Sequence, residues 1–302
     1  MTDRMSCNNT SSITASSAGP NRLWRSAVCD MSADVPLLSM NAKTGSRPRS
    51  FDAATVERAA RAWMTCLRIV ASKSHQGHFN ELGTGLFGFA TGSPIATLNG
   101  YASIAMPADE ETSIDRLAGQ KPLSFPWSLT LRLPEPTPSF VQLASSMGLN
   151  NQILMPFMLK ELGPDDIRSG ANLIDTVSST EDPAVHRRLL AQGFAAPEEI
   201  FTAFCTDHLF KDPSVTAYVG RVGGEDVATG LSIIADGCVG IFNVATPPEH
   251  RRRGYGRAVV SRLLCDALTK GASVAALHSS LDAVPFYESM EFRRAESWSV
   301  FL

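Results

Sequence analysis

The sequence predicts an α/β protein built on a mixed sheet. Short apolar runs alternate with amphipathic helical patterns along most of its 302 residues, and strands separated by single helices are typical of layered α/β folds. Near residue 250 a strand-like run leads through a basic, glycine-bearing turn into a helical pattern. The composition, 44% hydrophobic and 19% charged, is typical of a globular protein. A chain of this length forms one large domain or two ordinary ones.

Residues 1–50 differ from the rest of the chain. They are rich in Ser, Thr, Asn and Ala and contain no continuous apolar stretch of the kind that a secretory signal requires. Segments of low hydrophobicity with many turn-forming residues rarely bury enough apolar surface to fold. We therefore expect a disordered tail over 1–50.

Residues 51–162 are expected to form a first α/β half. It opens with an amphipathic helix, in which Val56, Trp63 and Val70 share one face. The elements expected in this half are a helix at 53–71, strands at 85–90 and 97–105, a short helix at 111–117, a strand at 127–132, a helix at 140–147 and a strand or extended segment at 153–162. The polar stretch 163–166 predicts a boundary between two domains.

Residues 163–302 are expected to form a second, complete half. Its clearest local signal is the Gly223-Gly224 turn between two apolar runs, which predicts a hairpin. The elements expected here are a strand at 171–178, helices at 182–193 and 197–209, hairpin strands at 215–222 and 227–235, a strand at 239–246, a helix at 257–268, a strand at 273–278, a short helix at 282–289 and a strand at 297–302.

The turn between the strand at 239–246 and the next helix carries the clearest functional signal. Glycines at 254 and 256 let the backbone approach a ligand closely, and a helix N-terminus offers free amides and a favourable dipole to an anion. The residues that would form this pyrophosphate site are Arg251, Arg252, Arg253, Gly254, Tyr255, Gly256 and Arg257. The alternative is a solvated basic loop before an ordinary helix. Neither the G-x-x-x-x-G-K-[ST] nor the G-x-G-x-x-G spacing is present.

Other classes of function find little support in the sequence. A net charge of −3 argues against nucleic-acid binding, and no run of 18 apolar residues indicates a membrane span. The six cysteines and six histidines show no metal-ligand spacing, so we expect no metal and reduced thiols in a cytoplasmic protein.

Two motifs in register resemble the GNAT superfamily of N-acetyltransferases. The first is Arg251-x-x-Gly254-x-Gly256, the family's R/Q-x-x-G-x-G/A pattern. The second, about one helix and one strand later, is Ser280-x-x-Ala283-x-x-x-Tyr287-x-x-x-Glu291-Phe292, which is similar to the family's N-x-x-A-x-x-x-Y-x-x-x-G-F. Ser replaces the usual Asn, and Glu replaces the usual Gly. Because that glycine often takes positive φ, we expect the turn at Glu291 to be built in another way.

The resemblance implies a GNAT-like acyl-CoA N-acyltransferase fold in two tandem halves, of which only 163–302 is complete. Residues 51–162 resemble a degenerate acetyltransferase-like half, because no R-x-x-G-x-G turn occurs before residue 160. This first half is expected to serve as a scaffold.

The resemblance also implies the chemistry. Acetyl-CoA would donate the acetyl group, with its pyrophosphate on residues 251–257. The backbone of Val244, Ala245 and Thr246 would hold the thioester carbonyl and the pantetheine arm, since fixed amide donors stabilise developing negative charge. Tyr287 matches the position of the general acid for the coenzyme thiolate. Its alternative role is that of a core tyrosine beside Phe286.

The group that takes the proton from the amine stays open between several residues. Glu198, Asp207 and His208 belong to the helix expected to border the acceptor cleft. His278 ends the strand that should diverge from the strand of Val244, and the terminal carboxylate of Leu302 follows the last strand.

Three functions fit the sequence. The favoured one is acetyl transfer to the primary amine of a small molecule or peptide by direct attack in a ternary complex. The others are a non-catalytic acyl-CoA-binding sensor and a basic-loop interaction protein without coenzyme. We expect no nucleic-acid or membrane partner. A homodimer could form if the C-terminal strand lies at a sheet edge.

Overall fold

A computed structural model describes residues 50–83, 85–104, 110–169 and 176–302. The predicted tail therefore lies outside the described residues except for Ser50. The same holds for the first five residues of the strand predicted at 171–178.

The first half follows the predicted order of elements closely. The sequence pattern missed one strand, β1, whose residues alternate irregularly between exposed and half-buried. The elements are α2 (Ala53–Lys73), β1 (His78–Gly83), β2 (Leu86–Ala90), η1 (Ala96–Leu98), β3 (Asn99–Ser103), α3 (Glu110–Ala118), β4 (Ser128–Leu131), α4 (Pro138–Ser146) and β5 (Gln152–Glu161).

The second half departs from prediction at two places: a short helix at Pro164–Ser169 was not predicted, and one predicted helix is divided. The helix predicted at 197–209 is two short helices, because Thr206 breaks the pattern and its hydroxyl accepts a hydrogen bond from the Leu209 amide at 3.1 Å as a new N-cap. The elements are α5 (Pro164–Ser169), β6 (Thr176–Thr180), α6 (Pro183–Phe194), α7 (Glu199–Thr202), α8 (Asp207–Phe210), β7 (Val215–Val222), β8 (Glu225–Ala235), β9 (Cys238–Ala245), η2 (Pro248–His250), α9 (Tyr255–Thr269), β10 (Val274–His278), α10 (Val284–Glu288) and β11 (Arg293–Phe301).

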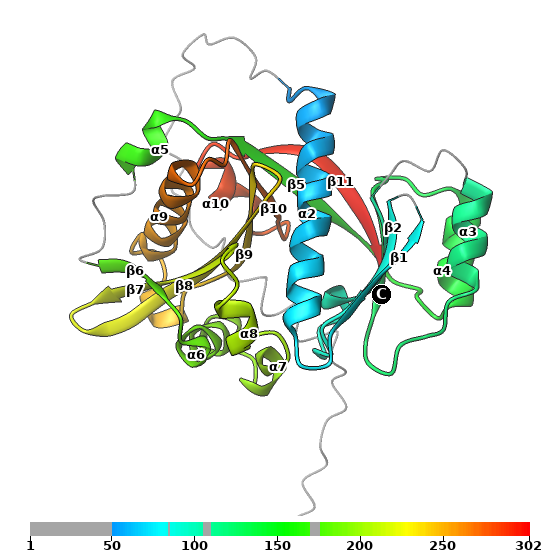
Figure 1. Ribbon diagram of the computed structural model, residues 1–302, viewed down its shortest axis with the longest axis horizontal. Helices are drawn as coiled ribbons and strands as arrows, with labels where there is room; N and C mark the ends of the chain where they lie inside the picture. Colours follow the sequence, from blue (N-terminus) through cyan, green and yellow to red (C-terminus); the bar gives the residue numbers. More distant parts are fainter. Residues whose placement is uncertain (1–49, 84, 105–109, 170–175) are drawn as a thin grey trace, which may run out of the picture.

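All eleven described strands form one mixed sheet, in the order β1-β2-β3-β4-β11-β5-β10-β9-β8-β7-β6 (Figure 1). The strand directions repeat in the two halves: β1, β2 and β3 are antiparallel and β4 is parallel to β3, just as β7, β8 and β9 are antiparallel and β10 is parallel to β9. The last strand of each half is exchanged, so that β5 pairs with β10 and β11 pairs with β4.

This exchange overturns one expectation about association. The C-terminal strand β11 has a partner on each side, β4 and β5, so it is not an edge strand and cannot offer its backbone to a second copy. The exchange also interlocks the two predicted domains across the boundary at 162–163. The domain boundary at 162–163 therefore stays a prediction, because β5 of the first half lies between β11 and β10 of the second half in the sheet.

Helix α2 joins the two halves across one face of the sheet (Figure 1). Asp52 caps it by accepting a hydrogen bond from the Thr55 amide at 2.8 Å. Its buried stripe, which includes Ala59, Cys66 and Val70, packs in the largest core cluster with residues of β2, β5, β8 and β10. A helix contributed by the first half thus covers strands of the second.

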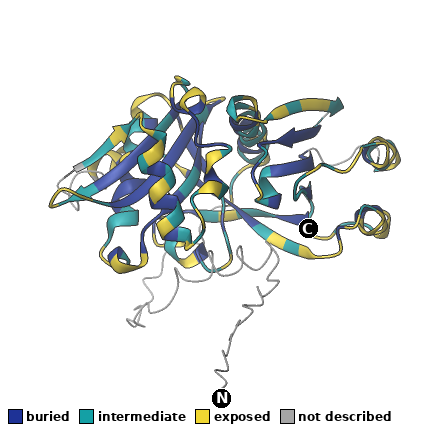
Figure 2. Cartoon of the chain, turned by 90° about the horizontal axis from the view of Figure 1, so that it is seen from below, coloured by how far each residue is buried: buried dark blue, intermediate teal, exposed yellow. Residues whose placement is uncertain are grey.

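The two faces of the sheet are filled by alternate residues of each strand. In β10, Val274 and Ala276 face the α2 side, whereas Ala275 and Leu277 pack with α9 and α10 on the other side. Figure 2 shows the buried residues concentrated in the strands and the exposed ones on the outer helices. A third cluster lies under α3 and α4. Among the described residues no helix is both long and apolar enough to cross a membrane.

Candidate active site

The central parallel pair of strands opens at one end. β9 and β10 pair only from Cys238 with Val274 to Gly240 with Ala276. Beyond this point β9 stays with β8, while β10 stays with β5. The strands therefore diverge at their carboxyl ends, as predicted for His278 and the strand of Val244, and the opening lies where open α/β sheets commonly bind ligands.

A bulge turns the edge of β9 toward this opening. Thr229 of β8 pairs with Ala245, whereas Leu231 pairs with Phe242, so β9 holds one residue more than β8 over this stretch. Asn243, at φ 54°, provides the left-handed backbone that the bulge needs. The amides of the predicted stretch from Val244 to Thr246 thus follow a point where the regular ladder is broken.

The basic turn has the geometry of a helix N-terminus. Gly254 precedes α9 at φ 85°, a left-handed conformation that glycine adopts without steric cost. The first intrahelical bond described runs from the Ala258 amide to the Gly254 carbonyl at 3.0 Å. The amides of Tyr255, Gly256 and Arg257 therefore occupy the first turn, where no helical carbonyl is available to them.

The four arginines of the turn divide into two groups. Arg251 donates to the backbone carbonyls of Thr246 at 3.1 Å and Gly193 at 2.7 Å, and Arg257 donates to the Ser289 carbonyl at 3.1 Å. These two side chains tie the turn to its neighbours. Arg252 and Arg253 are exposed. Arg251 and Arg257 thus fix the shape of the predicted pyrophosphate site, while the charges of Arg252 and Arg253 lie at its surface.

Close packing joins the turn to the end of β9. A Cβ on Gly256 would lie 3.2 Å from the Thr246 hydroxyl oxygen, and one on Gly193 would lie 2.8 Å from the Ala245 Cβ. Side chains at either position would push the elements apart. Gly256 therefore allows α9 to start directly beside β9, which keeps the anion site adjacent to the opening in the sheet.

Tyr287 lies on α10, at the wall of the opening. Its ring packs edge-on against Phe286 at 5.0 Å and Phe292 at 5.7 Å, and only 8% of the residue is exposed. Burial raises the pKa of its hydroxyl above the usual value, so the group stays protonated at neutral pH. Within the described residues no protein group is hydrogen-bonded to this hydroxyl. Tyr287 is thus a core residue that also lines the opening, with its hydroxyl protonated.

The second motif keeps its turn despite its two replacements. Ser280 accepts a hydrogen bond from the Ala283 amide at 3.2 Å and so starts the turn before α10. Glu291 takes φ 69°, so the expectation that this turn avoids positive φ is wrong. Its exposed carboxylate lies 3.0 Å from the buried Nζ of Lys160.

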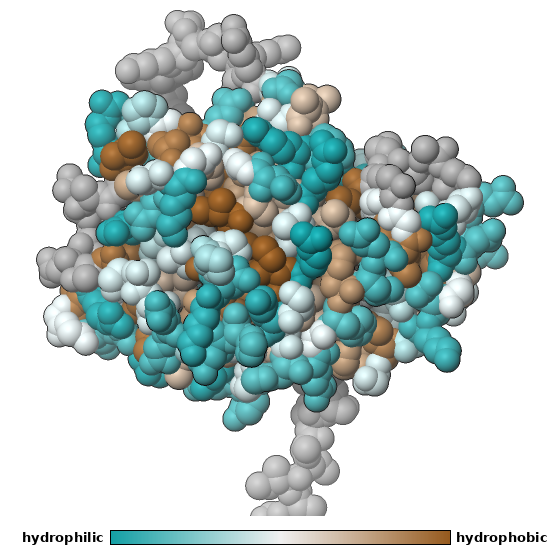
Figure 3. Space-filling view, viewed as in Figure 1, coloured by the Kyte–Doolittle hydropathy of each residue, from teal (hydrophilic) through white to brown (hydrophobic). Residues whose placement is uncertain are grey.

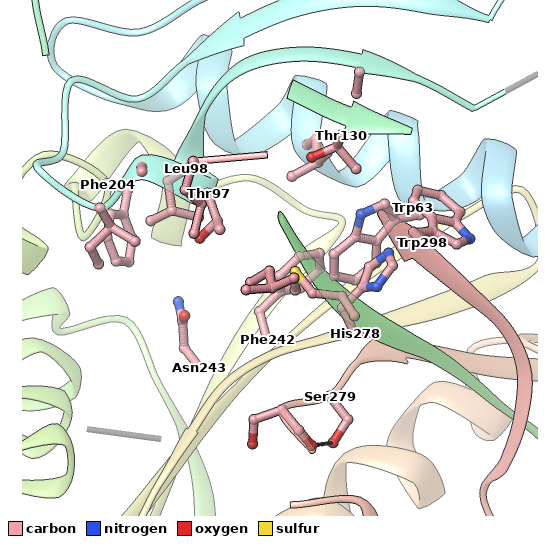
Figure 4. A pocket seen from close by; sticks show the side chains of 18 of the residues that line it. Trp63, Thr97, Leu98, Thr130, Phe204, Phe242, Asn243, His278, Ser279 and Trp298 are labelled. Atoms are coloured by element: carbon pink, nitrogen blue, oxygen red, sulfur yellow. Dashed lines mark hydrogen bonds between the residues drawn. The ribbon is translucent and has the colours of Figure 1, made fainter. Parts of the chain in front are cut away.

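A cavity of about 370 Å³ occupies the opening and extends between the two halves. Of the residues predicted to form the site, Val244 and Tyr287 line the cavity. Ala245 and Thr246, at the end of β9, are buried and do not line it, and residues 251–257 follow in the next turn and the start of α9. Figure 4 shows Trp63, Phe242, His278 and Trp298 gathered in one group.

His278 is the only one of the predicted proton-accepting side chains that lines the cavity. Its ring lies between Trp63, Phe157 and Trp298, with centroids 4.6–4.9 Å away. Burial lowers the pKa of the imidazole to about 3, so His278 is neutral at pH 7. Leu302 also lines the cavity.

The other predicted candidates lie elsewhere. Glu198 is held by Arg187 at 2.8 Å, and Asp207 and His208 are exposed on α8. The break in the predicted helix at Thr206 explains the difference, because it places Asp207 and His208 on a separate turn that faces solvent. These three residues therefore do not line the cavity.

The residues present fit an acyl-coenzyme A. The bulge, the opening and the cationic helix start follow one another along β9 and α9, and Gly256 lets α9 begin directly beside the end of β9. Among the described residues no group of three or more His, Cys, Asp or Glu side chains is placed to hold a metal ion.

Residues 184–292 match the model of the Acetyltransferase (GNAT) family. This region is a GNAT acetyltransferase domain. The fold of the longer chain is similar to that of a GCN5-related N-acetyltransferase from Kribbella flavida, with a TM-score of 0.55, 19% identity and coverage of 81% of this chain and 94% of the other. It is also similar to a conserved protein of unknown function from Staphylococcus epidermidis, with a TM-score of 0.51, 11% identity and coverage of 74% and 93%.

Sequence patterns did not reveal several residues that line the cavity. Asn243 is polar in an otherwise apolar strand and tolerates left-handed backbone, which is a usable signal for a bulge. Trp63, Phe89 and Leu98 line the cavity from the first half, and no local pattern connects them to the motifs at 251–257 and 280–292.

Proposed function

We propose that this protein transfers the acetyl group of acetyl-CoA to a primary amine by direct attack in a ternary complex. The observation that carries the proposal is the opening between β9 and β10, with the Tyr287 hydroxyl on its wall and the start of α9 next to it. The pyrophosphate would lie on the first turn of α9, beside Arg252 and Arg253.

The chain's own groups would act at two places. Backbone amides after the bulge, from Val244 onward, would stabilise the negative charge that develops on the thioester oxygen, an effect of roughly 3 kcal/mol per donor. The Tyr287 hydroxyl would donate its proton to the sulfur as the carbon–sulfur bond breaks and the carbon–nitrogen bond forms. The amine nitrogen loses one proton to water, and the Tyr287 phenolate recovers one proton from water, so that the products are the amide and the free thiol.

The first experiment measures binding and turnover separately. Acetyl-CoA at 100 times its dissociation constant should stabilise the protein by about 2.7 kcal/mol in thermal melting. Tyr287→Phe should lower kcat about a hundredfold and leave the dissociation constant of acetyl-CoA unchanged. Tyr218→Phe is the matched control, because its hydroxyl contacts Asp266 at 3.2 Å and Tyr218 is not a cavity residue.

Two outcomes would count against the proposal. If acetyl-CoA gave no stabilisation at millimolar concentration, the predicted pyrophosphate site would not bind the coenzyme. If acetyl-CoA bound but no amine released free thiol, the chain would be an acyl-CoA-binding sensor instead.

A further inference from the structure

We propose that the cavity between the two halves binds the acceptor, and that this acceptor is a monoamine with an aromatic body. The proposal rests on the function proposed above and adds the chemical class of its substrate. It is based on the chemistry of the cavity wall.

The wall carries no charged side chain among the described residues: no Asp, Glu, Lys or Arg lines it. An acceptor with a carboxylate or phosphate would lose its hydration there without gaining a cation, and a polyamine could pair at most one of its ammonium groups, with the terminal carboxylate of Leu302. Acidic acceptors and polycations are therefore disfavoured. A compound with a single amine can enter in its neutral form, which an apolar wall favours over the ammonium.

Aromatic rings form much of the wall. Trp63 stacks on Phe242 with centroids 4.4 Å apart and planes 16° from parallel, which presents a flat apolar surface. Phe87, Phe89 and Phe204 add further rings from β2 and from the segment before α8. Flat rings pack well against a flat ligand by offset stacking or edge contacts. An aromatic body fits this surface better than a long polar chain.

One polar group in this apolar surface lacks a partner. The Nδ1 atom of His278 is buried and has no hydrogen-bond partner in the part of the chain that the structure describes. A buried nitrogen in this state costs about 1–3 kcal/mol, and an N–H group of the acceptor would recover this cost if the His278 ring turned to present the atom to the cavity. Because His278 stands at the divergence of β9 and β10, an amine near it would also be close to the edge of β9.

Both halves contribute to the cavity. Trp63 and Leu67 come from α2, Leu98 from η1 and Thr130 from β4, whereas Phe242 and His278 come from the second half. Figure 4 shows Thr97, Leu98 and Phe204 on the opposite side of the view from His278 and Trp298. In Figure 3, apolar side chains gather beside α2 on an otherwise mainly hydrophilic face. The first half thus has a binding role without a coenzyme site of its own.

The test compares kcat/KM for 2-phenylethylamine, 1,4-diaminobutane and a lysine peptide, with acetyl-CoA as donor. We expect 2-phenylethylamine to be preferred at least tenfold. Thr97→Asp places a carboxylate in the wall and should lower the ratio of kcat/KM for 2-phenylethylamine over 1,4-diaminobutane at least tenfold. Thr202→Asp, an exposed residue of α7 outside the cavity, is the matched control and should leave the ratio unchanged.

Binding without turnover separates the two proposals. Trp63 and Trp298 line the cavity, so 2-phenylethylamine should change the intrinsic fluorescence, and Thr97→Asp should weaken this binding relative to Thr202→Asp. If acetyl-CoA did not bind but the amine did, the proposed function would fail and the cavity assignment would stand. If acetyl-CoA turned over with the diamine or the peptide preferred, only the acceptor class would be overturned. Faster transfer from decanoyl-CoA than from acetyl-CoA would assign the cavity to the acyl chain and overturn the inference.

Discussion

The two halves of the molecule have the same strand directions but differ at their parallel strand pair, β3–β4 in the first half and β9–β10 in the second. We call the carboxyl end of each pair its seam, and a coenzyme would enter at the seam of the second half. In the first half, β3 and β4 stay paired to their carboxyl ends, where Ser103 faces Leu131 and its carbonyl accepts from the Arg132 amide at 2.9 Å. The Arg132 guanidinium closes this end by donating to the Ile104 carbonyl at 3.0 Å and to Glu296 at 2.8 Å. In the second half the same seam is open.

The charges beside the two seams differ in sign. The first turn of α3 carries Glu110 and Glu111, whereas the turn that starts α9 carries Arg252 and Arg253. A helix N-terminus with two carboxylates in its first turn has its dipole already compensated and repels phosphate. Equal topology with opposite charge explains why only the second half is a candidate for coenzyme binding.

The turns at the two ends of α4 in the first half have the same hydrogen bonds as the turns at the two ends of α10 in the second half. Thr137 accepts from the amide three residues later at 3.5 Å, as Ser280 does at 3.2 Å. At the other end Gly148, at φ 83°, occupies the position of Glu291, at φ 69°. Their amides donate to the carbonyls three residues earlier at 3.0 Å and 2.9 Å.

In this correspondence Ala144 occupies the position of Tyr287. The amide of Leu149 donates to the Ala144 carbonyl at 2.9 Å, and that of Phe292 donates to the Tyr287 carbonyl at 3.1 Å. The first half therefore has a methyl group where the second has the proposed acid. This offers a structural reason for the prediction that residues 51–162 are a degenerate unit, which stays a prediction.

The largest effect is expected when the acidic first turn of α3 is copied into α9. Gly254→Glu places a carboxylate next to the proposed pyrophosphate. A repulsion of about 3 kcal/mol, reasonable for charges a few ångströms apart, would raise the dissociation constant of acetyl-CoA about a hundredfold. Titration calorimetry measures this change.

Gly271→Glu is the control for backbone strain. Gly271, at φ 90°, follows the other end of α9, and nothing lies within 4 Å of its Cβ position. Both variants should lose about 1–2 kcal/mol of stability from the left-handed backbone. If Gly254→Glu and Gly271→Glu weakened coenzyme binding equally, this result would contradict a pyrophosphate site at Gly254.

A smaller effect is expected in the pH dependence of the free energy of unfolding, to which histidines of the two halves should contribute differently. His186 and His278 of the second half are buried and neutral, with pKa values lowered by burial to about 3, whereas His75 and His78 of the first half are exposed. In the unfolded chain a histidine has a pKa of about 6.5 and binds a proton first as pH falls. Stability is therefore complete above pH 6.5 and decreases between pH 6.5 and 3.

By linkage, each buried histidine should cost about 2 kcal/mol at pH 5 relative to pH 8. His278→Gln should remove its share of this difference, and His75→Gln should leave it unchanged. Urea unfolding at the two pH values measures both. A His278→Gln variant with the full pH dependence of the parent would show that His278 is not buried in its neutral form.

The sequence predicted the elements whose signals are local. Helix α2, the β7–β8 hairpin and α9 follow from apolar periodicity, a Gly-Gly turn and the spacing of Gly254 and Gly256. The break at Thr206 was also readable, because Thr206-Asp207 is a good helix start. Strand β1 was missed because its sequence, with Asn80 and Glu81 exposed, lacks an apolar alternation.

The sequence could not predict the exchange of β5 and β11 or the composition of the cavity. Strand pairing depends on which partner the fold brings near, and β5 could complete its own half as well as the other by its pattern alone. The cavity joins Trp63 to Trp298, residues that no spacing rule connects. The motifs therefore located the proposed coenzyme site, while the proposed acceptor site required the three-dimensional structure.

The smallest expected effect tests the one turn where the two halves use different residues for the same left-handed backbone. Glu291→Gly copies the first half's Gly148 and should relieve about 1 kcal/mol of strain, but it also removes the ion pair with Lys160. That pair contributes little, because the Glu291 side chain is 81% exposed and Lys160 keeps Asp166 at 2.8 Å. We therefore expect Glu291→Gly to be more stable than Glu291→Ala by about 1 kcal/mol in urea unfolding, with Gly148→Ala losing a similar amount. An Ala variant at 291 as stable as the Gly variant would show that the turn carries no strain, and the correspondence between the two turns would then be one of hydrogen bonds alone.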